Sequence, residues 1–442
     1  MLISSLLAIL QIFLIGYICY YEYKAKSPAV FMWLTLLLMF GLMHLLTVFT
    51  GQTDFPMWVL DTASLFVCLF CVLYIITRKV VRHKTGIPPF YYKEEQDSSR
   101  FVSYLLILFF AVVLYRAYAV YAHTGSFFSV SWGTMREMSA ETTFGSVIIS
   151  AYFAASGILL ISLLGKKKML SILVALLILF TATVSRNRVE MLPLFVSLLA
   201  FLLFKSRLFE KLSPKSIFIM GFIGLFVVYA VFGMRVFRHQ GSMEALIASS
   251  LTFVEFNSIV LEQIMGGEGE LGLRSVFYYF IYNNNNFVNF GQGHTYIRML
   301  LVLIPTALSF GLKPPDFAIS MGTAYNPHLP GFSTHPTLFG DCFANFGFFG
   351  FFLGIFWALL ISTIDYIVNS RKNQELKMAL FLITSANFIV MARGSVYNAF
   401  FLLTWGSIFL FLLYAISKCV IKRSSVNDNC LSKQKIKESI GL

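Results

Sequence analysis

The sequence predicts an all-α polytopic membrane protein. Its 442 residues are 58% hydrophobic and only 12% charged, whereas a soluble protein of this size carries about 25% charged residues. Apolar stretches of about 17 to 25 residues, each long enough to cross a hydrocarbon core of roughly 30 Å as a helix, recur along the whole chain. We therefore expect no separate soluble domain.

About eleven segments are expected to span the membrane, and the two shortest ones form a tight helical hairpin around SRNRVE. The first segment lacks a positive n-region and a clear cleavage site, so we interpret it as a retained helix. The expected spans are 3–20, 30–49, 57–77, 101–120, 146–164, 169–184, 191–204, 217–233, 346–368, 378–392 and 398–417.

Four regions follow from this plan. Residues 1–233 hold the first eight spans, residues 234–345 form a large ordered outer loop, residues 346–417 hold the last three spans, and residues 418–442 form a basic tail. An outer N-terminus puts YEYKAK, RKVVRHK, GKKK, KSRLFEK, SRKNQELK and the tail on one side, which the positive-inside rule makes cytoplasmic. The six cysteines do not suggest a disulfide framework.

The net charge of +13 is distributed as in a membrane protein and does not indicate nucleic-acid binding. Of the 34 basic residues, 24 fall in the cytoplasmic segments, which is the ordinary topological signal. Nine of the other ten are arginines. The ten are Arg116, Arg136, Arg186, Arg188, Arg235, Arg238, Arg274, Arg298, Arg393 and Lys313.

These outer arginines suggest a site for phosphate. Guanidinium is a planar, always-charged fork that binds phosphate oxygens through two hydrogen bonds. Several of these arginines follow helix ends, in SRNRVE, FGMRVFRH and MARGSVYN. That placement suits an anionic head group whose tail stays in the bilayer. The alternative is that each arginine extends to lipid phosphates or pairs with Glu137, Glu190 or Glu244.

The outer loop is expected to be ordered. LTFVEFNSIVLEQI (251–264) has helical apolar spacing, and YNNNNF (282–287) is typical of a turn. YIRMLLVLIPTALSFGLKPP (296–315) has an apolar core of about fourteen residues broken by Pro305, which is too short to span a membrane. This stretch predicts a short re-entrant or interfacial helix.

GFSTHPTLFGDCFANFGFFG (331–350) joins a polar half to a run of Phe and Gly. We expect the polar half, with His335 and Asp341, to face a cavity, and the next membrane helix to start at Phe346. Gly347 and Gly350 would allow another helix to approach closely. A purely structural His335 is as consistent with the pattern as a catalytic one, because imidazole serves both uses.

Several chemistries have no motif in this chain. HExxH, a Walker loop and G-x-S-x-G are missing, and Glu268-Gly-Glu270 is more typical of a solvated turn than of a metal clamp. We therefore expect no metal and no cofactor. Intramembrane ionisable groups are scarce, with Asp61 and Asp365 near span ends and His44 alone, which disfavours a proton-coupled transporter.

The eleven-span plan, the RNR at 186–188, the outer loop with Pro305 and KPP, and STHPTLFGDCFANFGFFG together resemble the bacterial O-antigen, or oligosaccharide repeat-unit, polymerase family. The resemblance covers most of the chain. It implies a class C glycosyltransferase of the bacterial plasma membrane with its active site on the outer face. Such an enzyme transfers the growing glycan from undecaprenyl diphosphate to the next lipid-linked repeat unit and releases lipid diphosphate.

The resemblance also suggests residue roles. Arg186 and Arg188 fall where the family carries arginine after a serine, Asp341 stands where a carboxylate follows the glycine, and Arg393 matches a late outer arginine. The base for the acceptor hydroxyl would be Asp341 or His335. The diphosphate would be bound by Arg186, Arg188, Arg235, Arg298 and Arg393.

The implied partners are donor and acceptor glycans on undecaprenyl diphosphate, membrane lipid, a chain-length regulator protein and a flippase. Two other functions stay open. His335-Pro336 is similar to a feature of O-antigen ligases, and a lipid-linked oligosaccharide flippase would also need cationic groups. A flippase should show two similar halves, and no internal repeat is evident.

Overall fold

We analysed a computed structural model of the chain. It describes residues 2–91, 100–125, 145–185, 187–205, 252–265, 272–287, 292–328 and 333–440, together with a few single positions between these ranges. All regular elements in these ranges are helical. Side chains are described up to Cys419.

Nine helical segments in the described ranges are long and apolar enough to cross a membrane, which supports a polytopic membrane protein. Of the other expected spans, 191–204 is the short helix α10 (Leu192–Lys205), and 217–233 lies almost wholly outside the described residues. The nine are Leu2–Lys24, Ala29–Thr50, Met57–Thr85, Arg100–Thr124, Gly145–Leu164, Lys168–Ser185, Thr337–Asn369, Gln374–Ala392 and Val396–Cys419.

Most of these segments are single helices, and three contain a break. The single helices are α1 (Leu2–Lys24), α4 (Met57–Thr85), α5 (Arg100–Thr124), α9 (Lys168–Ser185), α19 (Gln374–Ala392) and α20 (Val396–Ile440). The broken ones are α2 (Ala29–Leu36) with the π-helical η1 (Leu37–Leu42) and α3 (Met43–Thr50), α7 (Gly145–Ala155) with α8 (Gly157–Leu164), and α17 (Thr337–Phe346) with η5 (Gly347–Phe352) and α18 (Leu353–Asn369).

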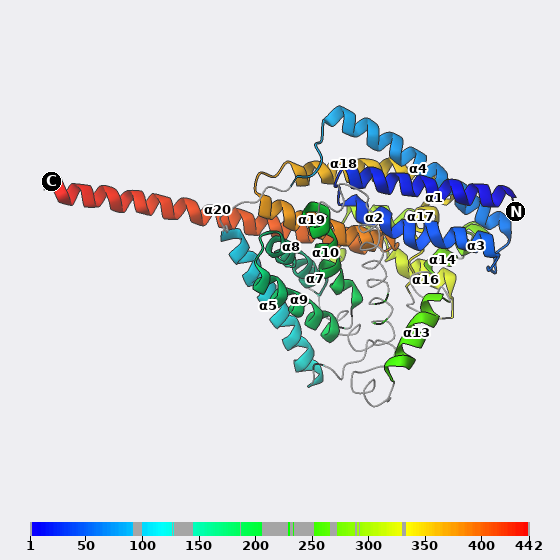
Figure 1. Cartoon of the computed structure of the whole chain (residues 1–442), viewed down its shortest axis with the longest axis horizontal. Coiled ribbons are helices and arrows are strands. Elements are labelled where there is room, and N and C mark those ends of the chain that lie inside the picture. Colours follow the sequence, from blue (N-terminus) through cyan, green and yellow to red (C-terminus); the bar gives the residue numbers. More distant parts are fainter. Residues whose placement is uncertain are drawn as a thin grey trace.

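Helix α19 is the centre of the bundle. Its apolar window is 94% buried, whereas that of α1 is 28% buried. Figure 1 shows α1, α2, α4 and α18 lying along one side of α19 and α20, with α5, α7, α8, α9 and α10 on the other. The N-terminus and the far end of α20 lie at opposite ends of the molecule (Figure 1).

The outer loop is ordered as expected at two places. Helix α13 (Phe253–Met265) matches the apolar spacing of 251–264. The YNNNNF turn is confirmed by the left-handed backbone of Asn284 and Asn285. Between them, α14 (Leu273–Tyr282) packs into the bundle, where the ring of Phe277 is fully buried. This part of the loop therefore belongs to the membrane-domain core and is not a separate outer module.

Within 296–315, where a short re-entrant or interfacial helix was expected, the helical structure is short and interrupted. Helix α15 (His294–Leu300) ends after two turns, and only the 3₁₀ turn η4 (Thr306–Leu308) follows before α16 (Phe317–Tyr325). Pro305 has an extended backbone, and its ring cannot donate to a helical ladder. Asp316 caps α16 by accepting a hydrogen bond from the amide of Ala318 at 3.0 Å.

The expected helix start at Phe346 is wrong, because helical structure already begins at Thr337. Gly347, with φ +59°, interrupts the helix between α17 and η5, and a Cβ on this glycine would have no atom within 4 Å. A Cβ on Gly350 would lie 2.2 Å from the carbonyl oxygen of Cys342. The close approach is therefore confirmed at Gly350, while Gly347 is explained by its positive φ.

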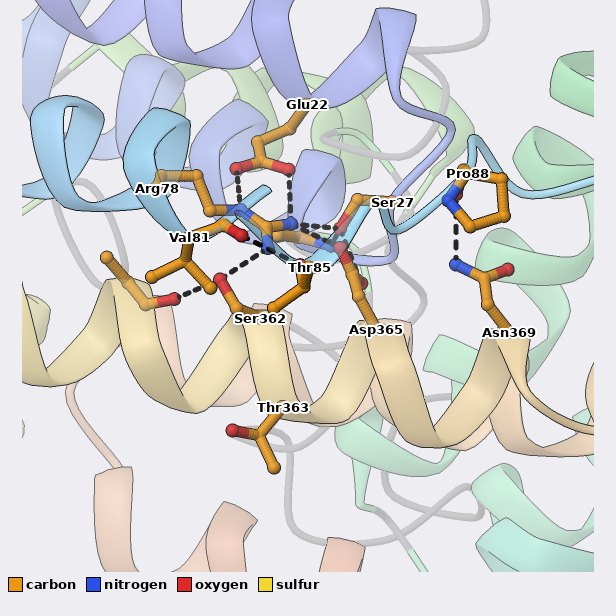
Figure 2. Close-up of polar contacts among 12 residues, drawn as sticks. Glu22, Ser27, Arg78, Val81, Thr85, Pro88, Ser362, Thr363, Asp365 and Asn369 are labelled. Atoms are coloured by element: carbon orange, nitrogen blue, oxygen red, sulfur yellow. Dashed lines mark hydrogen bonds and ion pairs between the residues drawn. The ribbon is translucent and has the colours of Figure 1, made fainter. Parts of the chain in front are cut away.

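A buried ion cluster joins three helices at the end of the bundle where α1, α4 and α18 finish (Figure 2). The guanidinium of Arg78 donates two hydrogen bonds to Glu22, Nε to Oε1 at 2.8 Å and Nη2 to Oε2 at 2.9 Å. Nη2 also pairs with Asp365, and Nη1 donates to Ser362 at 2.8 Å. All three charged side chains are at most 1% exposed. Arg78 belongs to RKVVRHK, which the sequence analysis interpreted only as a topological signal, so its role in joining three helices was not expected.

Two hydroxyl groups complete this cluster. Ser27, in the turn between α1 and α2, donates to the second oxygen of Asp365 at 2.9 Å, and Tyr74 donates to Glu22 at 2.8 Å. The lone His44 is also bonded internally, with its ring nitrogens 2.6 Å from the Tyr278 hydroxyl and 2.7 Å from the Ser64 hydroxyl. His44 is therefore explained by packing.

Loss of Arg78 should destabilise the protein strongly. Arg78→Met leaves two buried carboxyl groups without their cation, a change that costs about 3–5 kcal/mol in comparable sites. The triple variant Glu22→Gln, Arg78→Met, Asp365→Asn removes all three charges and should recover much of that loss. Thermal unfolding in detergent checks this, and a triple variant less stable than the single one would contradict it.

Candidate functional site

One open pocket gathers the motifs that the sequence analysis selected. It is a small pocket that is open to its surroundings, and it is lined by residues of α15, the first turns of α16, the 333–336 stretch, α17 and the turn from α19 into α20. His335 and Asp341 both line it, as do Gly394 and Ser395. The pocket lies at the end where α20 begins, opposite the Arg78 cluster along α18 and α19.

Asp341 is almost fully buried in the pocket wall. Its Oδ2 accepts a hydrogen bond from Thr295 at 3.1 Å, and its Oδ1 accepts one from the Asn345 amide at 3.2 Å. Asn345 also donates to Thr295 Oγ1 at 3.1 Å and accepts from the Thr295 backbone amide at 3.1 Å. These hydrogen bonds, which all come from uncharged donors, fix the direction of the carboxyl group.

Thr337, between His335 and Asp341, has a strained backbone. Its φ is +66°, a rare conformation for a β-branched residue that persists only where the surroundings enforce it. The amide of Thr337 donates to the carbonyl oxygen of Arg393 at 3.2 Å. Gly394, at φ +102°, packs so closely that a Cβ would lie 2.7 Å from the Thr337 nitrogen. The start of α17 is thereby held against the α19–α20 turn.

His335 and Arg393 meet at this junction. His335 is half-buried and lines the pocket, and its carbonyl carbon would lie 3.1 Å from a Cβ on Gly394. Arg393 is the residue immediately before Gly394 and also caps α19. The structure therefore brings His335 and Asp341 to one pocket and places the backbone of Arg393, 58 positions after His335, against the start of α17.

A cationic and aromatic group flanks the same pocket. The guanidinium of Arg298 lies 4.3 Å from the ring centre of Tyr397, which lines the pocket, and the ammonium of Lys313 lies 5.5 Å from it. Arg298 also donates to the carbonyl oxygen of Pro314 at 2.7 Å. Of the predicted diphosphate-binding arginines, Arg298 thus reaches the pocket wall through Tyr397.

The remaining predicted arginines are not placed in this pocket. Arg186 and Arg235 lie outside the described residues, and Arg188 begins the 3₁₀ turn η2 (Arg188–Met191), with its side chain also outside them. Within the described ranges, the pocket around Asp341 has no lining residue from 185–191. Ser185 instead lines a second pocket, between α5 and α9.

Arg116 fits the alternative in which an arginine of this group pairs with a nearby glutamate. It forms an ion pair with Glu190 at 2.6 Å and lies 5.8 Å from the ring centre of Tyr152. Ser185 donates to the same Glu190 oxygen at 2.9 Å, and Tyr152 donates to the Glu190 backbone at 3.0 Å. This pair stabilises the joint between α9 and α10.

Sequence reasoning missed several residues of the pocket. Asn345 could have been found, because it stands four residues after Asp341 and so shares its helix face. Thr295 and Tyr397 carry no such signal. Tyr296, next to Thr295, lies 3.2 Å from the Cys342 sulfur and accepts from Trp357 Nε1 at 3.4 Å. Desolvation raises the pKa of the Tyr296 phenol, so this hydroxyl stays protonated and acts as a fixed hydrogen-bonding group.

No protein-family model matches the chain, and neither a curated protein nor a solved structure matches it. The resemblance to O-antigen polymerases therefore rests on the motifs given in the sequence analysis. Activity, substrate and partners are proposals.

Gly394→Ala should destabilise the protein by more than the cost of placing alanine at a positive φ. At Gly51, with φ +65° and no atom within 4 Å of a Cβ, the matched Gly51→Ala should cost about 1–2 kcal/mol of backbone strain. Gly394→Ala adds a clash with the backbone of Thr337, so its unfolding midpoint in detergent should fall further. Equal midpoints for the two variants would show that the junction can relax.

Proposed function

We propose that this chain is a membrane glycosyltransferase that polymerises lipid-linked oligosaccharide repeat units. It transfers the growing glycan from undecaprenyl diphosphate to a sugar hydroxyl of the next unit and releases the lipid diphosphate. The observation that carries the proposal is the pocket that combines an oriented carboxyl group, Asp341, with His335 and with Tyr397, against which two cations lie at the pocket edge.

The two parts of the pocket suit the two needs of glycosyl transfer. The acceptor hydroxyl must lose a proton as it attacks the anomeric carbon, and Asp341 or His335 can accept it. The departing diphosphate carries negative charge, which fixed guanidinium groups in a water-poor site stabilise. Among the described arginines, Arg298, which lies against Tyr397, and Arg393, which precedes Gly394, are our candidates for this role.

The position of the pocket supports a lipid-linked substrate. It lies where α19 ends and α20 begins, and both of these helices are long and apolar enough to cross a membrane, so we place the pocket near the membrane boundary. We assign this end to the outer face of the bacterial plasma membrane, with the N-terminus outside and the C-terminus in the cytoplasm, because that orientation places the Lys-rich segments inside.

The flippase alternative receives less support. A flippase needs a central cavity whose charged groups are reached from both sides in turn. Three charged groups at the end opposite the pocket, Glu22, Arg78 and Asp365, are bonded to one another and at most 1% exposed. Charged groups held in this way are not open to a substrate, which fits an enzyme that works from one side.

The proposal is tested with purified protein and a lipid-linked repeat unit, without nucleotide. We expect a ladder of products on a gel, spaced by one repeat unit, and release of undecaprenyl diphosphate. Products that form only on a lipid A–core acceptor would identify a ligase. Movement of the lipid-linked unit across proteoliposomes without any new glycosidic bond would identify a flippase.

The base is identified by comparing two substitutions at equal protein levels. Asp341→Asn keeps the shape and size of the side chain but cannot accept a proton, so the polymerisation rate should fall by a factor of about 10² to 10⁴. His335→Ala should reduce the rate less if Asp341 is the base. Asp61→Asn, which neutralises a carboxyl group on α4 away from the pocket, is the matched control.

Initial rates of ladder formation measure this series. Wild-type polymer length in the Asp341→Asn variant would show that Asp341 is not the base. A larger loss for His335→Ala than for Asp341→Asn would assign that role to His335.

A further inference from the structure

Residues 300–312 form an apolar loop that projects from the pocket end of the bundle. Its large hydrophobic side chains are unusually exposed, with Phe310 at 93%, Leu300 at 85% and Leu312 at 71%. Leu303 and Leu308 are also more than half exposed. A loop that faces only water would not present five such side chains together.

The tip of this loop has a strained conformation that exposes its aromatic ring. Phe310 has φ +48° and Gly311 has φ +79°. The left-handed region is unfavourable for a bulky residue and persists where the rest of the loop enforces it. The consequence is a tight turn that holds a nearly fully exposed phenyl ring at its outermost point.

Two cations close the base of the loop. Lys313 Nζ donates to the carbonyl oxygen of Ile304 at 2.9 Å, and Arg298 Nη1 donates to that of Pro314 at 2.7 Å. Both cations lie against Tyr397, at the edge of the pocket. A loop whose ends are bridged in this way is compact. The segment from 297 to 313 contains no acidic residue.

We infer that residues 300–312 are a membrane-inserting finger that dips into the lipid leaflet beside the pocket and places Arg298 and Lys313 at the depth of the lipid phosphates. The order of groups matches an interface, with aliphatic and phenyl groups at the tip and cations with a tyrosine at the base. Apart from the short 3₁₀ turn η4, the loop is not helical, and irregular backbone exposed to lipid is excluded from the deep hydrocarbon region. The tip therefore inserts shallowly.

A second consequence rests on the proposed function. The finger fixes the pocket at the leaflet surface, so the diphosphate of a lipid-linked substrate reaches the pocket while its tail stays in the bilayer. Because insertion itself involves no catalysis, its test is independent of the proposed reaction.

The insertion is tested with a fluorescent probe on the full-length chain. Phe310→Cys is labelled with the fluorophore NBD in a variant whose Cys19, Cys419 and Cys430 are replaced by serine. Cys68, Cys71 and Cys342 are buried and should not react in the folded protein. Reconstitution into lipid nanodiscs that contain doxyl-labelled lipids should give a blue-shifted emission and strong quenching by a doxyl group near the head of the acyl chain.

Gln52→Cys, in the exposed loop between α3 and α4, is the matched control. It should be quenched by aqueous iodide and not by doxyl lipids. Iodide quenching at position 310 without doxyl quenching would overturn the inference. A blue-shifted emission at position 310 without doxyl quenching would also overturn it, since a second copy or another protein would then cover the finger.

The link to the substrate is tested with Leu308→Glu combined with Phe310→Glu. Insertion of two charges into the leaflet is unfavourable, so KM for a long-chain lipid-linked unit should rise roughly tenfold or more. KM for a short-chain, water-soluble analogue and kcat for both should stay unchanged. A wild-type protein without any transfer activity would refute the proposed function and leave the probe result intact. An active protein whose KM does not change would refute only this link.

Discussion

The arrangement of the bundle depends on one buried guanidinium. Arg78 bonds to both oxygens of Glu22 and to Asp365, and so ties α1, α4 and α18 together in a place buried from solvent. A charge in such a place is stable only when its partners are fully formed. The three helices therefore have one correct register, because a shift of any of them would strand a charge. This specificity follows from the penalty of an unpaired charge more than from the attraction within the pair.

This fixed end allows irregular structure at the other. The pocket is built from a left-handed Thr337, a Gly394 that contacts another backbone, and a break at Gly347. Each of these would let an isolated segment adopt other conformations. Because α18 is fixed at the Arg78 cluster and α19 is buried along nearly its whole length, the segments that adjoin their other ends at the pocket have little conformational freedom. The strain at Thr337 is then held in place, and the carboxyl group of Asp341 keeps one direction.

The helices could be predicted from the sequence because length and hydropathy are local properties, and every expected span within the described residues overlaps helical structure. Pairings between distant residues could not be predicted. Glu22 and Asp365 are 343 positions apart, and nothing near either one indicates that Arg78 joins them. The start of α17 was misplaced for the same reason, since Thr337 takes its left-handed conformation against Arg393, far along the chain. Asp341 and His335 were selected correctly as pocket residues because their motif is contiguous.

The apolar stretch around Pro305 illustrates how composition and conformation give different information. Its hydrophobicity predicts contact with the bilayer, and our inference for the exposed loop rests on that property together with the exposure of its side chains. Its conformation depends on details that hydropathy does not contain, namely the missing donor of Pro305 and the left-handed turn at Phe310 and Gly311. A continuous helix would lie flat on the membrane and carry Arg298 and Lys313 to separate places. The folded-back loop instead brings both cations to one tyrosine at the pocket edge, so the residues at the base of the inferred finger also place positive charge beside the site.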